Sequence, residues 1–135
     1  GLGDVYKRQY KDRMKFRLAE TYLLLAEAYL RQDMPDKAAD AVNEVRRRAK
    51  VSDVSDEEMT MDFLLDERIR ELYGEESRRF TLIRTGKLLE RVRKYNPEAR
   101  DLIQDFHVLW PIPQAIRDAN VGNFPQNPGY EGYEG

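Results

Sequence analysis

Few residues in this chain have the type and spacing that catalysis needs. The chain holds one histidine, His107, and no cysteine, so neither a histidine-pair metal site nor a thiolate nucleophile can form. Glu67 and Glu71 lie four residues apart and could share one helix face. Arg68 and Arg70 stand beside them and offer charge neutralisation. No phosphate-binding glycine loop or nucleophile elbow is present. The sequence therefore predicts a protein that is not an enzyme and carries neither metal nor cofactor.

Aromatic residues are the other candidates, because flat rings bind sugars and apolar ligand faces. They are Trp110, Tyr130 and Tyr133. Trp110 stands between Leu109 and Pro111, which favours a buried structural role. Both tyrosines lie in a glycine-rich tail, where exposure is the simpler expectation. We therefore assign no ligand-binding residue from the sequence.

The composition fits one soluble helical domain. In 135 residues, 36% are charged and the formal net charge is −2, which gives no reason to expect nucleic acid or an anionic membrane as a partner. No apolar run reaches the roughly 18 residues of a membrane span. Residues 1–11 lack an initiator methionine and any apolar period, so we expect a non-native or disordered leader, with an ordinary frayed terminus as the alternative.

The first two helices are expected at residues 12–32 and 36–50, joined by a short turn. Apolar residues recur in both at three- and four-residue intervals. Tyr22, Tyr29 and Ala38 match the spacing of a tetratricopeptide-like hairpin, together with Leu25, Ala26 and Val42. No second copy follows, and Leu24 and Leu25 widen the apolar stripe. One such pair cannot bury its faces alone, so we expect exposed apolar surface on this chain.

Two further helices are expected, the first starting at a capping box of Ser55 and Glu58 and running to Tyr73, before Gly74. Its predicted buried residues are Leu64, Leu65, Ile69 and Leu72. The second should span residues 76–95, with a weak point at Thr85-Gly86. Its predicted buried residues are Phe80, Leu82, Ile83, Leu88, Leu89 and Val92.

Charge divides sharply between these two helices. Residues 53–76 hold ten acidic and two basic residues, whereas residues 78–94 hold seven basic and one acidic. A basic helix suits nucleic acid, but the acidic neighbour offers a simpler partner. We therefore predict that Glu67, Arg68, Arg70 and Glu71 knit the two helices together with Arg78, Arg79 and Arg84.

The C-terminal part has a different character. Residues 106–110 read as a short extended run, which Pro111 and Pro113 keep out of a helix. His107 is expected to be a polar residue beside this packed strand. One or two helical turns should follow at residues 114–120, and residues 123–135 form an aperiodic tail. The fold class is therefore all-α, with tetratricopeptide-like hairpins and an extended, proline-rich C-terminal segment.

Three stretches, in this order, resemble the C-terminal part of the SusD/RagB family. The first is the hairpin, from AEAY at residues 26–29 through DKAA at 36–39 to NEVR at 43–46. The second is LLDERIRELYGEESRRFTLIRTGKL at 64–88. The third is HVLWPIPQ at 107–114, closing with QNPGY at 126–130. Thr81 and Thr85 depart from the commonest family pattern, in which an acid and an aromatic are frequent. The resemblance implies that residues 12–130 are the C-terminal part of a SusD-like helical domain, followed by a loose tail at 131–135.

The same resemblance implies a function. Proteins of this family are surface lipoproteins of the cell outer membrane that capture an oligosaccharide or peptide ligand and deliver it to a SusC-like TonB-dependent transporter. Membrane attachment would come only through a lipid anchor outside this fragment. The alternative is a tetratricopeptide-type protein–protein adaptor. A glycan hydrolase would need paired carboxylates facing a cleft, and the sequence shows no such pair.

Overall fold

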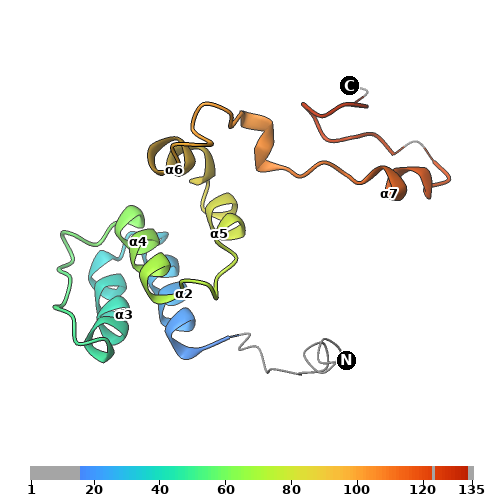
Figure 1. Cartoon of the computed structure of the whole chain (residues 1–135). Coiled ribbons are helices and arrows are strands. Elements are labelled where there is room, and N and C mark those ends of the chain that lie inside the picture. Colours follow the sequence, from blue (N-terminus) through green and yellow to red (C-terminus); the bar gives the residue numbers. More distant parts are fainter. Residues whose placement is uncertain (1–15, 123, 134–135) are drawn as a thin grey trace, which may run out of the picture. The chain divides into compact units, whose positions relative to one another are not determined.

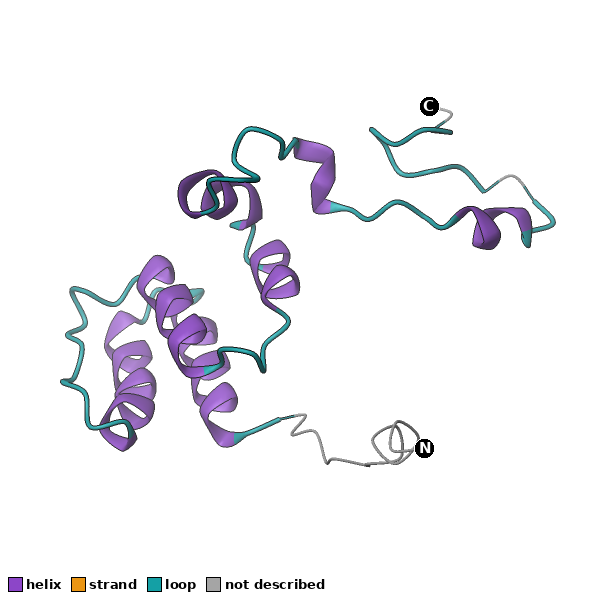
Figure 2. Cartoon of the chain, viewed as in Figure 1, coloured by secondary structure: helices purple, strands orange, loops and turns teal. Residues whose placement is uncertain are grey.

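The computed structural model describes residues 16–122 and 124–133, which divide into two units that meet between Glu76 and Ser77. The described residues form helices and no strand (Figure 2). The all-α prediction is therefore confirmed. The predicted leader at residues 1–11 lies outside the described residues.

The first unit is built on a helical hairpin (Figure 1). Helix α2 spans Leu18–Leu30 and α3 spans Pro35–Arg48, with Pro35 in the first turn of α3. Proline suits that position because its missing N–H has no intrahelical partner there. The two helices pack along each other through small residues and Leu23, which lets their backbones approach closely. Together they contribute Ala19, Leu23, Ala26, Ala38, Ala41, Val42 and Val45 to the buried core.

The outer side of α2 stays apolar and exposed. Leu18, Leu24 and Leu25 are all exposed, although Leu23 beside them is fully buried. This agrees with the expectation that one hairpin leaves apolar surface uncovered.

Helix α4 spans Met61–Glu71 and packs against α2. The predicted capping box does form, since Glu58 N–H donates to Ser55 Oγ and Ser55 N–H donates to Glu58 Oε2, both at 3.3 Å. It closes a turn before the helix, so the predicted helix start was wrong. Met59 is buried in the core, and Thr60 after it is extended and caps α4 by accepting Phe63 N–H at 3.2 Å.

A buried amide fixes the link between α3 and α4. Asn43 is only 5% exposed. Its Nδ2 donates to the carbonyl of Val54 at 3.0 Å, and its Oδ1 accepts the Val54 N–H at 2.8 Å. One side chain thus satisfies both polar groups of a buried backbone residue, which would otherwise destabilise the fold.

In the second unit, α5 spans Arg78–Arg84 and α6 spans Leu88–Tyr95. The single helix predicted for residues 76–95 therefore breaks at its predicted weak point. Gly86 has φ +70°, which glycine adopts most easily. Leu82 and Leu88 are buried, whereas Phe80 is exposed, so its predicted burial was wrong. Phe80 stands two positions from Leu82 and therefore faces the opposite side of this short helix.

The predicted extended run at residues 106–110 was partly wrong, because Asp105–Val108 forms a 3₁₀ turn, η1. The turn is closed by His107, whose Nδ1 accepts the N–H of Gln104 at 2.8 Å. Beyond it, Leu109 is extended, and Pro111 and Pro113 lie outside any helix, as expected. Helix α7, Gln114–Asp118, is the short helix predicted there.

Among the described residues, no helix combines the length and apolar character that crossing a membrane would require.

Candidate functional site

Two glutamates of α4 are bound to arginines of the first unit. Glu67 pairs with Arg46 and Arg70, each at 2.8 Å. Glu71 pairs with Arg17 and Arg48, each at 2.7 Å. Because two arginines neutralise each carboxylate, this arrangement favours a structural role over proton transfer. The predicted pairing of this helix with Arg84, an exposed residue at the end of α5, stays a prediction.

Arg17 is the most heavily used of these cations. It donates hydrogen bonds to Glu75 at 2.5 Å and to Glu71 at 2.7 Å. These bonds raise the pKa of Arg17 above its ordinary value, so the guanidinium remains charged and continues to join the start of α2 to the end of α4.

Arg68 is the most deeply buried charge among the described residues of the first unit, with 1% of its surface exposed. Its Nε lies 3.4 Å from Oε1 of the buried Glu76, and its Nη2 lies 3.7 Å from Glu20. Nη1 of Arg68 and Oε2 of Glu76 have no hydrogen-bond partner in the described part of the chain. Because this pair is buried and two of its atoms already lack hydrogen bonds, removing either partner should strongly destabilise the first unit.

The predicted hairpin residues lie on the two packed helices α2 and α3. Ala38 is fully buried, and the half-buried rings of Tyr22 and Tyr29 pack against the core of the first unit. Tyr22 also lines a shallow hollow of about 400 Å³ beside Arg17 and Arg48. Both of these arginines are already paired with Glu71, so this hollow presents no unpaired charge to a ligand.

In the second unit, the tail folds back on η1 through its aromatic residues. The ring centroids of Phe106 and Tyr130 lie 4.9 Å apart in an edge-to-face arrangement, and Tyr130 Oη donates to the carbonyl of Leu109 at 2.9 Å. Gly129 permits the contact: it has φ +85°, and a Cβ there would lie 2.3 Å from Cγ of Phe106. Tyr130 is therefore half-buried and structural, although exposure was expected. Tyr133 is exposed, as expected.

Two amide side chains of the tail, Gln126 and Asn127, also bond to the extended segment. Gln126 accepts the N–H of Ile112 at 2.7 Å and donates to its carbonyl at 3.0 Å. Asn127 Nδ2 donates to the carbonyl of Trp110 at 2.7 Å. The QNPGY stretch thus holds residues 109–112 in an extended form. The structural role of Gln126 was not predicted. The available signal was its position directly before Asn127 in the QNPGY stretch.

Trp110 stacks on a cation. The guanidinium of Arg79 lies 4.2 Å from the centroid of the Trp110 ring, and Arg79 Nη2 donates a short hydrogen bond to the carbonyl of His107. The indole is 57% exposed, so the expectation of a buried tryptophan was wrong. Asn127 and Gln126 hold the backbone of the extended segment, so the segment does not depend on burial of the indole. Arg79 covers only one face of the ring.

Replacing Trp110 by alanine should therefore have a small effect on stability. An exposed cation–π contact contributes about 0.5–1 kcal/mol, well below the roughly 3–5 kcal/mol of an emptied buried aromatic site. Urea unfolding followed by far-UV circular dichroism measures the loss. A loss above about 3 kcal/mol would show that the indole is buried in solution.

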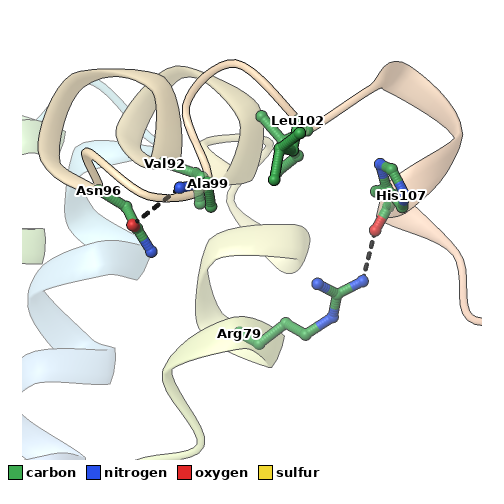
Figure 3. Close-up of a pocket in the computed structure, with 7 residues that line it drawn as sticks. Arg79, Val92, Asn96, Ala99, Leu102 and His107 are labelled. Carbon is green, nitrogen blue, oxygen red and sulfur yellow. Dashed lines mark hydrogen bonds between the residues drawn. The ribbon is translucent and has the colours of Figure 1, made fainter.

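A hollow of about 370 Å³ opens beside Arg79 (Figure 3). It is lined by Arg79, Val92, Asn96, Ala99, Leu102, Ile103 and His107. In Figure 3 one terminal nitrogen of Arg79 bonds to the His107 carbonyl, and the other lies toward the remaining lining residues. Its volume lies near the lower end of small-molecule sites, about 300–1,000 Å³. This hollow is a candidate binding site in the second unit.

The described residues bring together no group of three His, Asp or Glu side chains that could hold a metal ion. The arrangement of the hollow, with one cation above aliphatic walls, suits binding.

Comparison with known proteins identifies the family that the sequence matches. The model of the SusD family matches residues 3–130. SusD-like protein P25 of Formosa agariphila is 36% identical over 113 residues, which cover 76% of this chain and 21% of that protein. Starch-binding protein SusD of Bacteroides thetaiotaomicron is 35% identical over 125 residues, covering 86% of this chain and 21% of that protein. SusD-like protein P38 of Formosa agariphila is 32% identical over 108 residues, covering 72% and 20%.

No solved structure matches the chain. The chain spans about a fifth of the length of the curated relatives it matches.

Proposed function

Because the chain belongs to the SusD family, we propose that it forms part of a binding protein that captures a nutrient glycan or peptide at the cell surface. The observation that carries this proposal is the family match over residues 3–130. One relative is named as a starch-binding protein, which favours an oligosaccharide or a similar soluble polymer as the ligand of the whole protein.

The geometry supports binding without turnover. The carboxylates best placed for acid–base work, Glu67 and Glu71, are each held by two arginines. General acid–base catalysis needs a group that can donate a proton to the substrate or accept one from it, and these two carboxylates are already bound to arginines. We expect the whole protein to bind its ligand and to release it unchanged.

The proposal includes a partner and a place. The whole protein would sit at the outer membrane through a lipid anchor outside this chain and pass its ligand to a SusC-like TonB-dependent transporter. The two-unit helical scaffold described above would supply a frame for that assembly. No nucleic acid takes part in this function.

The whole protein with its transporter provides the test. Purified full-length protein is titrated with oligosaccharides and peptides by calorimetry, and the same mixtures are analysed by chromatography for products. We expect binding with unchanged ligand, and co-purification with the transporter encoded beside it. Turnover of the ligand would overturn the binding assignment, and a failure to co-purify would remove the transporter from it.

A further inference from the structure

The hollow beside Arg79 presents hydrogen-bond donors and no free side-chain acceptor among its described lining residues. Arg79 carries only donors. It has no carboxylate partner among the residues that the structure describes, since its contacts there are the His107 carbonyl and the Trp110 ring. Its Nε is buried without a hydrogen-bond partner. Arg79 is therefore a positive charge at the edge of a hollow, with no carboxylate bound to it in the part of the second unit that the structure describes.

The acceptors of the two neighbouring polar side chains are already used. Asn96 Oδ1 accepts the N–H groups of Glu98 and Ala99, each at 3.1 Å, which leaves its Nδ2 donor. His107 Nδ1 accepts the Gln104 N–H at 2.8 Å. The proton of a neutral imidazole then lies on Nε2, which is a donor. Three separate side chains thus favour a ligand that brings acceptors and negative charge.

The rest of the lining is aliphatic. Val92, Ala99, Leu102 and Ile103 form the walls, and they offer no polar side-chain atom to a bound group. A sugar acid would bring a carboxylate but also hydroxyl groups, for which these aliphatic walls offer no hydrogen-bond partner. An apolar body attached to a carboxylate suits the walls better.

From this combination we propose that the hollow is a subsite for the C-terminal residue of a short peptide with an apolar last side chain. The carboxylate pairs with Arg79, as arginine's planar fork of donors allows. The apolar side chain lies against Leu102 and Ile103. The proposal rests on the proposed binding function and narrows its ligand to peptides at this one subsite.

The test uses the chain itself and small probes. N-acetyl-leucine is titrated into ¹⁵N-labelled chain and followed by amide chemical shifts, alongside N-acetyl-leucinamide, hexanoate and glucuronate. We expect N-acetyl-leucine to shift the amides of Ala99, Leu102 and Ile103. Its amide, which lacks the charge, should bind at least about tenfold more weakly, since a hydrogen bond to a charged group contributes about 1.5–3 kcal/mol. Hexanoate binding as tightly would assign the site to fatty acids, and glucuronate binding more tightly would assign it to acidic sugars; either result overturns the peptide proposal.

Four variants distinguish an effect on binding from an effect on folding. Arg79→Gln should weaken N-acetyl-leucine binding about tenfold or more, and Arg79→Lys by less. Leu102→Ala trims an exposed wall residue and should weaken binding several-fold without unfolding the unit. Arg84→Gln removes the same charge from the same helix outside the hollow and should leave binding unchanged.

The outcomes distinguish this inference from the proposed function. No shift at the hollow, or an Arg79→Gln affinity equal to wild type, overturns the subsite while nutrient binding by the full-length protein still stands. A second unit without dispersed amide signals also overturns it. Conversely, a full-length protein that binds neither glycan nor peptide would sink the proposed function, and the Arg79 series would still decide what the hollow binds.

Discussion

Replacing Arg68 by alanine should cost the first unit about 3–5 kcal/mol, because it leaves Glu76 charged and buried without its partner. The Arg68 side chain is 2% exposed and that of Glu76 is 3% exposed. Domains are stable by only about 5–15 kcal/mol in total, so the change should remove much of the unit's stability. Trp110, the only tryptophan, lies in the second unit. The loss is therefore best followed by hydrogen exchange of α2 and α3 amides.

A matched control is Arg70→Ala on the same helix. Arg70 also pairs with a glutamate, Glu67, but its side chain is 60% exposed, and exposed pairs contribute about 0.2–1 kcal/mol. The double change of Arg68 to methionine and Glu76 to leucine should recover most of the loss, because apolar residues of similar size often replace a buried pair at little cost. Equal losses for Arg68→Ala and Arg70→Ala would show that Arg68 is hydrated in solution.

The hairpin and the helix break were predictable because they depend on local rules. Small residues at helical spacing, such as Ala26 and Ala38, predict close helix packing wherever they occur. Pro35 suits the start of a helix, and Gly86 suits a break. Each of these signals lies within a few residues of its effect, so the sequence is sufficient to read them.

The backbone hydrogen bonds of Asn43 and Gln126 and the exposure of Trp110 could not be predicted in the same way. Asn43 bonds to a residue eleven positions away, and Gln126 to one fourteen positions away. A single polar residue carries no sign of such a distant backbone partner. The hollow was missed for a similar reason: Arg79 reads as one more cation in a basic stretch until its contacts show that it has no carboxylate beside it.

Replacing Asn43 by aspartate should destabilise the first unit by about 2–4 kcal/mol at neutral pH, although the side chains have nearly the same shape. The new oxygen would face the Val54 carbonyl in place of a donating amide, and the charge would be buried. The control is Asn96→Asp. The Oδ1 of Asn96 also accepts a backbone N–H, but the Asn96 side chain is exposed. This control should change stability by less than about 0.5 kcal/mol.

The loss of stability caused by Asn43→Asp, its deficit relative to wild type, should also depend on pH. Burial of the introduced carboxyl determines the direction of this dependence. Burial raises the pKa of the introduced carboxyl above that of the unfolded chain. When protonated, the carboxyl donates to the Val54 carbonyl and restores the two-way bonding. The folded variant therefore binds the proton more tightly than the unfolded one, so its deficit relative to wild type should shrink as pH falls and grow as pH rises through the folded-state pKa. Hydrogen exchange of α3 amides near pH 5 and near pH 7.5, each against wild type, measures both deficits. A deficit that is equal at the two pH values would mean that the carboxyl is solvated and that Asn43 does not hold Val54 in solution.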